Sequence, residues 1–324
     1  MEKILTISIA AYNVESYIRN TLDSLITPGS IDALQILVVD DGGKDGTLEI
    51  VKEYEEKYPN SIFGVHKENG GYGSVINTSL RLAEGKYFKQ LDGDDWFENE
   101  NMDELVELLR RVDADYVVTP RWLFNEVDSS KVFQDYYEKF PEGSYAFDDM
   151  EFTEISPMHC SIFRTELLRQ NNLSITEHCF YTDLELVYRP VPYIDSVYVW
   201  HKPVYVYRIG REGQSVSKTG IRKHYKEHSK VLWNLVDLYN GLKPQQTARR
   251  QFIRRRLLME IAGHMKYLCY LDPSKEHFQE MQAFGAKLQA QCPDVLKATV
   301  QYSRFVKIMV KTKYGAYHVA SRLM

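Results

Sequence analysis

The stretch Tyr87-Phe88-Lys89-Gln90-Leu91-Asp92-Gly93-Asp94-Asp95-Trp96 joins a strand-like run to three carboxylates within four residues. Carboxylates packed this closely repel one another, and a folded protein tolerates them mainly where a cation holds them together. Their oxygens suit Mg²⁺ or Mn²⁺, which keep coordination positions open for substrate phosphates. We therefore predict a divalent-metal site for a phosphorylated ligand, with Asp92, Asp94 and Asp95 as candidate ligands. The alternative is a solvated turn, because Asp and Gly are frequent turn residues.

Strand and helix patterns alternate on both sides of this stretch. Short apolar runs predict strands at about 6–12, 34–39, 61–66, 87–91 and 115–119. Apolar residues at helical spacing predict helices between them, at about 13–26, 46–57, 73–84 and 100–111. This alternation predicts an α/β fold with a largely parallel sheet. Residues 120–150 mix aromatic and charged side chains without a clear period, so their structure is not predicted.

Polar residues follow three of the predicted strands at the point where each strand ends. They are Asn13, the pair Asp40 and Asp41, and the run 92–95. Ligands of parallel α/β sheets bind beyond the carboxyl ends of the strands, so these polar groups should converge at one edge. Asp40-Asp41-Gly42 has a structural interpretation as a turn. It also has a functional one, because a carboxylate there can accept hydrogen bonds from a base N–H or a ribose hydroxyl.

Three familiar ligand-binding motifs are absent. The loop Gly70-Gly71-Tyr72-Gly73 lacks the GxxxxGK[ST] pattern of a P-loop, and it does not follow the first strand as a dinucleotide fingerprint should. The run that starts at Asp92 has Phe97 at its sixth position, where an EF-hand requires glycine. Four scattered cysteines without a CxxC pair argue against a zinc site or a disulfide framework.

Composition and charge favour a cytoplasmic globular protein with two different surfaces. We find no signal-peptide pattern at the N-terminus and no apolar run near the roughly 20 residues of a membrane span. Residues 1–221 hold 21 Lys and Arg against 38 Asp and Glu, whereas residues 222–324 hold 19 against 7. The second part is therefore strongly basic, and its pattern is helical. No recognition motif supports nucleic-acid binding, and the acidic body argues against it.

Basic and apolar residues share the predicted helices of the C-terminal region. Apolar rows such as Ile253, Leu257 and Ile261 run beside basic groups such as Arg254-Arg255-Arg256. A basic amphipathic helix can lie on an anionic membrane surface, so we expect peripheral attachment to the inner face of the cell membrane. The alternatives are a helical subdomain that packs on the rest of the chain and a contact in a homo-oligomer.

Four motifs, in order and at the right spacing, resemble the nucleotide-sugar domain of family 2 glycosyltransferases, which have the GT-A fold. They are Ser8-Ile9-Ala10-Ala11-Tyr12-Asn13, Val38-Val39-Asp40-Asp41-Gly42-Gly43, Asn69-Gly70-Gly71-Tyr72-Gly73 and Leu91-Asp92-Gly93-Asp94-Asp95-Trp96. The resemblance covers roughly 4–215. It implies a GT-A catalytic domain over 1–220, followed by a basic helical region over 221–324. It also implies sugar transfer from a nucleotide-sugar donor, commonly UDP-linked, with inversion at the anomeric carbon.

The resemblance also implies a role for individual residues. Asp183, in the first turn of a helix predicted over 180–189, takes the place of the catalytic base. Asp92 and Asp94 match the Asp-x-Asp that touches the ribose and the metal-bound diphosphate, with Asp95 adjacent. Arg208, Arg211 and Ser215 resemble a mobile loop that closes on the diphosphate. The other expected donor-binding residues are Ala11, Tyr12, Asn13, Asp41, Gly70 and Gly93.

This chain departs from the family pattern at several positions. Thr182 stands where family members commonly carry Glu before the catalytic Asp, which leaves Glu185 and Glu177 as alternative bases. Gly43 replaces a usual Ser, and Ile76 replaces a usual Arg. His159 has two interpretations, as a lining of the donor-sugar pocket or as a core histidine.

A metal-dependent inverting glycosyltransferase of the bacterial cell-surface polysaccharide type is therefore the leading hypothesis. A sugar hydroxyl is a poor nucleophile at neutral pH, so a carboxylate must take its proton during attack. A divalent cation and an arginine can stabilise the departing diphosphate. The acceptor would be a saccharide or a lipid-linked molecule. A second hypothesis is a non-catalytic nucleotide-sugar-binding or scaffold protein of the same fold. A third, a metal-dependent phosphohydrolase, lacks a nucleophilic Asp at the first strand.

Overall fold

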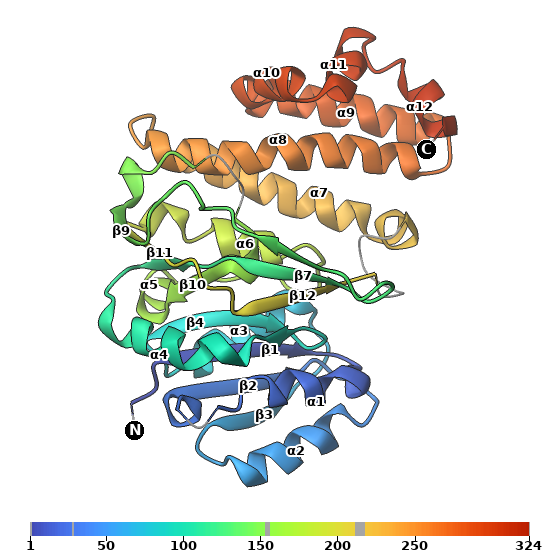
Figure 1. The fold of residues 1–324 in the computed structure, drawn as a ribbon. Helices are drawn as coiled ribbons and strands as arrows, with labels where there is room; N and C mark the ends of the chain where they lie inside the picture. Colours follow the sequence, from blue (N-terminus) through green and yellow to red (C-terminus); the bar gives the residue numbers. More distant parts are fainter. Residues whose placement is uncertain (1, 28, 153–155, 211–217, 324) are drawn as a thin grey trace. The chain divides into compact units, whose positions relative to one another are not determined.

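A computed structural model describes residues 2–27, 29–152, 156–210 and 218–323 of the chain. The chain divides into two compact units, Met1–Arg211 and Glu212–Met324 (Figure 1). The boundary expected after residue 220 falls in the first turn of helix α7 (Lys218–Gly241).

An eight-stranded sheet forms the centre of the first unit, in the order β3-β2-β1-β4-β10-β6-β11-β9. Its strands are β1 (Leu5–Ala11), β2 (Leu34–Asp40), β3 (Ile62–His66), β4 (Tyr87–Asp92), β6 (Tyr116–Val118), β9 (Gly143–Ala146), β10 (Ser161–Arg164) and β11 (Ser196–Val199). Strand β1 pairs in parallel with β2 and β4, and β2 pairs in parallel with β3. Strand β10 is antiparallel to both of its neighbours. The predicted α/β class with a mostly parallel sheet is confirmed.

Both faces of the sheet are covered, which explains why β1 and β2 are so apolar. Alternate residues of β2 pack on opposite sides: Ile36 and Val38 belong to one buried cluster, whereas Leu37 and Val39 pack with Val75 of α3. The first cluster also contains residues of α1, α2 and α4. The six helices that the structure describes in this unit are α1 (Glu15–Asp23), α2 (Thr47–Lys57), α3 (Tyr72–Leu82), α4 (Met102–Arg111), α5 (Thr165–Gln170) and α6 (Asp183–Tyr188) (Figure 1).

A second, four-stranded sheet accounts for much of the stretch whose structure was not predicted. Its order is β5-β12-β7-β8, formed by β5 (Trp96–Phe97), β12 (Tyr205–Ile209), β7 (Arg121–Asn125) and β8 (Lys131–Gln134). Aromatic side chains hold it together, with ring centroids of Trp96 and Phe124 at 5.2 Å and those of Trp122 and Phe133 at 5.1 Å. Because β5 directly follows the run of three carboxylates, this sheet fixes where that run leaves the central sheet.

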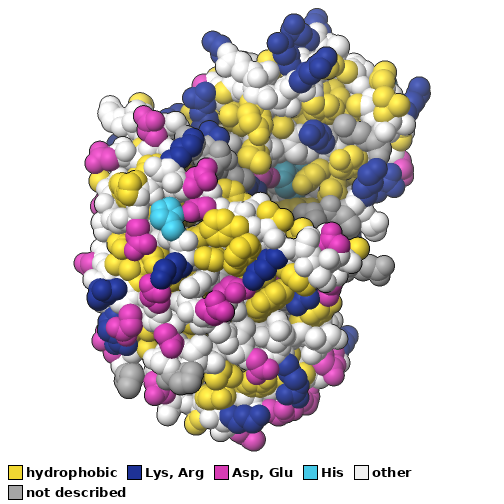
Figure 2. Space-filling view, viewed as in Figure 1, with side chains coloured by type: hydrophobic (Ala, Val, Ile, Leu, Met, Phe, Trp, Pro, Cys, Tyr) yellow, Lys and Arg dark blue, Asp and Glu magenta, His cyan; other side chains and the backbone are white. Residues whose placement is uncertain are grey.

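The second unit is helical, as predicted. Its described helices are α7 (Lys218–Gly241), α8 (Thr247–Tyr270), α9 (Lys275–Gln291), α10 (Pro293–Tyr302), α11 (Arg304–Lys311) and α12 (Tyr317–Leu323). Ser274 and Ser303 cap α9 and α11, accepting hydrogen bonds from the backbone N–H groups of His277 and Val306. Figure 2 shows Lys and Arg side chains gathered over this unit.

The apolar row Ile253, Leu257 and Ile261 does not form a membrane-facing surface, contrary to its predicted role. All three side chains are fully buried in the structure. Exposed apolar side chains do occur elsewhere in the unit, among them Tyr302 and Ile308. Among the helices of the described residues, none is long and apolar enough to cross a bilayer.

Candidate functional site

The carboxyl ends of β1, β2 and β4 lie side by side, and this places the predicted polar residues at one sheet edge. Ala11 of β1 is in register with Asp40 of β2, and Ala10 is in register with Asp92 of β4. The backbone N–H of Gly93 donates to the carbonyl of Ala10 at 3.0 Å. A Cβ atom at Gly93 would lie 2.6 Å from that carbonyl oxygen, so the close approach of the two strands requires glycine.

Asp41 organises the glycine-rich loop. Its carboxylate accepts hydrogen bonds from the backbone N–H groups of Gly70 at 2.9 Å and Gly71 at 2.8 Å. Lys67 Nζ lies 2.6 Å from the same carboxylate, which is almost fully buried. The sequence predicted that Asp41 and Gly70 contact the nucleotide directly. The structure joins them to each other, so Asp41 holds the glycine-rich loop in place.

Asn13 and Asp40 fix the neighbouring turn. Asn13 has a left-handed backbone (φ 53°), and its side-chain oxygen accepts a hydrogen bond from the Lys44 N–H at 2.8 Å. Asp40 accepts one from the Gly43 N–H at 3.1 Å and lies 2.7 Å from His66 Nδ1. A Cβ atom at Gly43 would lie 2.5 Å from the Asp40 carboxylate, so a side chain at this position would require that carboxylate to shift. Tyr12, by contrast, is 54% exposed and its ring is available to a ligand.

The carboxylates after β4 are held by tyrosines from distant segments. The Tyr72 hydroxyl donates a hydrogen bond to Asp92 Oδ1 at 2.5 Å, and the Tyr205 hydroxyl donates one to Asp95 Oδ2 at 2.7 Å. Asp95 is buried and also accepts the Arg208 backbone N–H at 2.8 Å. Burial, followed by the charges of Asp92 and Asp94, raises the pKa of Asp95 well above its usual value. This clustering concentrates negative charge where a cation would relieve the repulsion.

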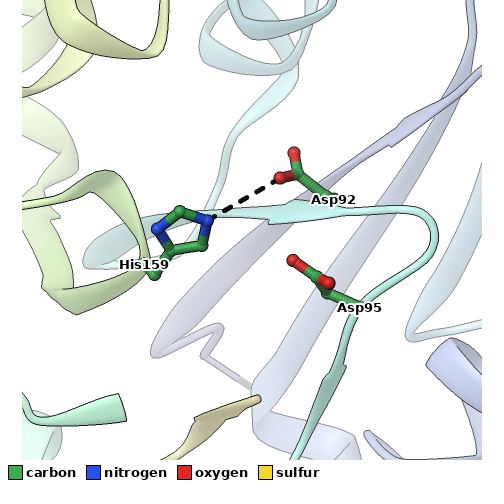
Figure 3. A group of neighbouring side chains, drawn as sticks. All are labelled: Asp92, Asp95 and His159. Carbon is green, nitrogen blue, oxygen red and sulfur yellow. Dashed lines mark ion pairs between the residues drawn. The ribbon is translucent and has the colours of Figure 1, made fainter. Parts of the chain in front are cut away.

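His159 faces the same carboxylates, a position that the sequence left open. Its Nε2 lies 3.9 Å from Asp92 Oδ2, and Figure 3 shows the ring pointing toward Asp92 beside Asp95. One ligand atom each from Asp92, Asp95 and His159 lies within 4.8 Å of the others, the spacing of a possible metal site. Arg121 Nη1 lies 2.7 Å from His159 Nδ1. Burial, with the charges of Arg121 and Lys89, lowers the pKa of His159 well below its usual value, so the ring is neutral.

The fit of a divalent cation to this site follows from the donor atoms. Because Arg121 can only donate, His159 Nδ1 must accept, and the ring proton is assigned to Nε2, which faces Asp92. A protonated nitrogen cannot ligate a metal. Both oxygens of Asp95 already accept hydrogen bonds. Asp92 Oδ1 likewise accepts one from Tyr72, and each carboxylate oxygen keeps a second lone pair, so the oxygens of Asp92 and Asp95 suit Mg²⁺ or Mn²⁺. The half-buried Asp94 lies between them in the chain.

The side chain of Arg208 contacts the loop that carries Asp92, Asp94 and Asp95. Its Nε donates to the Asp94 carbonyl at 2.8 Å, and its Nη1 lies 3.1 Å from Glu126. The guanidinium also stacks 4.8 Å from the Trp96 ring centroid and 4.9 Å from that of Tyr17. The sequence predicted that Arg208 contacts a diphosphate. In this structure its side chain is bound to protein groups, and Arg211 and Ser215 lie outside the described residues.

Asp183 begins helix α6 and lies near the same edge. Its charge, like that of Asp92, raises the pKa values of Tyr72 and Tyr207, although burial is the main cause for both tyrosines. Asp183 is half-buried, so it is accessible to a ligand. An acid in the first turn of a helix is also stabilised as a carboxylate by the helix dipole.

The alternative bases have other partners. Glu185 is fully buried and accepts hydrogen bonds from the Thr176 N–H at 2.7 Å and from Arg189 at 2.8 Å. Glu177 is exposed and accepts one from Asn77 Nδ2 at 2.9 Å. Both hold the segment before α6 against its neighbours. Of these three acids, Glu185 is closed off by burial, whereas Asp183 and Glu177 reach the surface.

Lys89 is a buried cation that the sequence did not reveal, because it sits in the middle of strand β4. Its Nζ donates to the His159 carbonyl at 2.9 Å and lies 5.4 Å from the Tyr205 ring centroid. Burial lowers the pKa of Lys89 to about 7. The hydrogen bond from Lys89 to the His159 carbonyl therefore fixes the backbone that carries His159.

Lys89→Met is expected to change how stability depends on pH. The unfolded chain holds the Lys89 proton up to its ordinary pKa of 10.5, whereas the folded chain loses it near 7. The wild type's free energy of unfolding therefore rises with pH in this window, by up to about 1.4 kcal/mol per pH unit. The variant lacks this rise, so its stability relative to wild type should be greatest near pH 7 and decline toward pH 10. Urea unfolding at several pH values measures this, and parallel pH profiles would contradict it.

Comparison with known proteins identifies the family. Residues 6–171 match glycosyl transferase family 2. This chain therefore belongs to that family of glycosyltransferases.

Several curated relatives share parts of the chain. It is 33% identical over 154 residues to glycosyltransferase GlyA of Streptococcus pneumoniae serotype 4, which covers 46% of this chain and 22% of that protein. It is 28% identical over 235 residues to the minor teichoic acid biosynthesis protein GgaB of Bacillus subtilis, covering 70% of this chain and 26% of that protein. The chain thus spans less than two thirds of the length of each of these two relatives.

Solved structures show a GT-A-like α/β fold followed by a helical C-terminal region. The structure of S. aureus TarS 1-349 in complex with UDP-GlcNAc gives a TM-score of 0.71 at 21% identity, covering 99% of this chain and 92% of that chain. The mannosyltransferase PcManGT from Pyrobaculum calidifontis, in complex with GDP-Man and Mn²⁺, gives a TM-score of 0.53 at 15% identity, covering 100% and 87%. The predicted family and fold are confirmed.

Proposed function

We propose that this protein transfers a sugar from a UDP-linked donor to a hydroxyl of a cell-surface saccharide or of a lipid-linked acceptor, with inversion at the anomeric carbon. The observation that carries the proposal is the convergence of Asp41 and Asp92 at one sheet edge, with Asp183 nearby: the Asp41 N–H donates to the Ala11 carbonyl, and Asp92 is in register with Ala10. The solved complex of TarS with UDP-GlcNAc supports a UDP-sugar as donor. The name of GgaB supports a place in teichoic acid or related polymer synthesis.

The donor would lie across the ends of β1, β2 and β4. The exposed Tyr12 ring would contact the nucleobase, and the backbone of Ala11 and Asn13 would line the ribose pocket. Asp92 and Asp94 would hold Mn²⁺ or Mg²⁺ against the diphosphate, and the cation would offset the charge that develops on the leaving UDP. The Mn²⁺ in the PcManGT complex supports this assignment. Neutral His159 would donate its Nε2–H within the donor pocket.

Asp183 would act as the general base. The acceptor hydroxyl loses its proton to the Asp183 carboxylate while its oxygen attacks the anomeric carbon and the bond to the diphosphate breaks. The basic helical unit would contact a polymeric acceptor, a membrane-bound acceptor or another copy of the chain, on the cytoplasmic side of the cell membrane. The scaffold alternative rests on Thr182, which replaces the usual Glu. Acceptor-dependent release of UDP by the wild-type protein would exclude it.

Metal removal should weaken donor binding. Chelation with EDTA is expected to lower the affinity for UDP-GlcNAc, or whichever UDP-sugar binds, by at least about tenfold, because the carboxylates then repel the diphosphate. Added Mn²⁺ should restore it. Calorimetric titration across a panel of UDP-sugars measures both effects. The Asp92→Asn variant should bind the UDP-sugar weakly with or without Mn²⁺. A wild-type affinity for the UDP-sugar that EDTA leaves unchanged would contradict the proposed metal site.

A further inference from the structure

A cavity of about 450 Å³ opens on the helical unit, where α7 ends and α8 begins. Three arginines line it, Arg250, Arg254 and Arg255, together with polar Thr247 and Gln251. These residues recur every three to four positions and so share one face of α8. No Asp or Glu lines the cavity among the described residues. A concave site with three guanidinium groups and no lining carboxylate favours a ligand of high negative charge.

Arg250 is held in a fixed geometry at the cavity wall. Its Nη1 donates to the carbonyls of Tyr239 at 3.1 Å and Leu242 at 3.0 Å, near the end of α7. Its guanidinium stacks 4.1 Å from the centroid of the Tyr239 ring. Nη2 lies 4.0 Å from an Asp294 oxygen, so one carboxylate already stands at the edge of this arginine. An arginine ordered in this way loses little further entropy when it binds an anion.

The start of α8 adds to the positive potential. Thr247 is the first residue of this 24-residue helix, and no acidic residue lies in its first turn. The amide N–H groups at a helix start carry partial positive charge, which favours an anion nearby. Of the other two arginines that line the cavity, Arg254 is exposed and Arg255 is half-buried.

We propose that this cavity binds the phosphate group of an organic phosphate ester, either a soluble ester or the headgroup of an anionic lipid. Several guanidinium groups in one cavity match the three or more oxygens of a phosphate better than the two of a carboxylate. The site belongs to the helical unit alone and does not depend on the proposed donor site.

The test compares two variants that each remove one positive charge from the same unit. Arg254→Gln alters the cavity, whereas Lys230→Gln alters an exposed residue of α7 outside it. Calorimetry with glycerol 3-phosphate probes a soluble ester. Cosedimentation with phosphatidylglycerol vesicles, against phosphatidylcholine vesicles, probes a lipid headgroup. Thermal unfolding of each variant confirms that it is folded.

Arg254→Gln is expected to weaken binding by about tenfold, the effect of one lost charge-assisted hydrogen bond. Lys230→Gln should stay close to wild type. If glycerol 3-phosphate shows this difference, the source is a soluble ester; if only phosphatidylglycerol vesicles show it, the source is a lipid. Equal weakening by both variants, or no binding of either probe, overturns the proposal. UDP-sugar affinity in the presence of Mn²⁺, measured on the same proteins, should be unchanged and reports separately on the donor site.

Discussion

Asp183→Asn is expected to lower the turnover number for sugar transfer by about 10²–10⁴-fold, the range for loss of a general base. The amide has nearly the shape of the carboxylate but cannot take the proton of an acceptor hydroxyl. Because Asp183 lies at the start of α6 and not in the carboxylate loop, donor binding should remain close to wild type. Release of UDP, followed in the presence of acceptor and Mn²⁺, measures turnover, and calorimetry measures donor affinity.

Glu177→Gln provides the matched control for this substitution. Glu177 is an exposed acid in the segment that precedes α6, and its partner is the Asn77 amide. Its loss should change turnover by less than about threefold, because a surface hydrogen bond contributes little. Full activity in Asp183→Asn would remove Asp183 from the mechanism. A large loss in Glu177→Gln, with activity retained in Asp183→Asn, would move the base to Glu177.

Asp41→Ala should be among the most destabilising substitutions in the first unit. It removes a buried carboxylate that accepts from Gly70 and Gly71 and pairs with Lys67. The partly buried lysine and two amide N–H groups then lose their acceptor, which costs about 3–5 kcal/mol. The glycine-rich loop should also lose its order, so donor affinity should fall together with stability.

Urea unfolding measures this loss, with Asp149→Ala as the control. Asp149 is exposed, and its replacement should change the free energy of unfolding by no more than about 0.5 kcal/mol. A similarly small change for Asp41→Ala would mean that the loop is held by other contacts. Hydrogen exchange at Gly70 and Gly71 gives a second readout, since their amides should exchange faster in the variant.

The first half of the first unit was predictable because the interactions that determine it are between residues close in the sequence. Buried parallel strands are continuous apolar runs, and β1, β2 and β4 each end in polar residues that read clearly in the sequence. The position of Asp183 at a helix start was also readable, since acidic residues favour the first turn. These features depend on neighbours in the chain, and sequence patterns report such neighbours well.

Other parts of the site depend on contacts between distant segments, and no local pattern reports these. His159 is oriented by Arg121, 38 residues away, and Lys89 reaches the His159 carbonyl across 70 residues. Strands β7 and β8 pair with each other and bring the rings of Trp122 and Phe133 into contact. Aromatic residues occur in several types of structure, so their presence in the sequence does not predict this pairing. Glu185 resembled a candidate base, but only the fold shows that it is buried among Thr176 and Arg189.

A crystal structure of the protein with UDP and Mn²⁺ would test the proposed donor and metal site. We expect an anomalous Mn²⁺ peak beside Asp92 and Asp94, with the diphosphate bound to the metal and the uracil at the end of β1 near Tyr12. We also expect an open path from the anomeric position to Asp183. UDP bound at any other place, or no Mn²⁺ at Asp92 and Asp94 when UDP is present, would contradict the proposal.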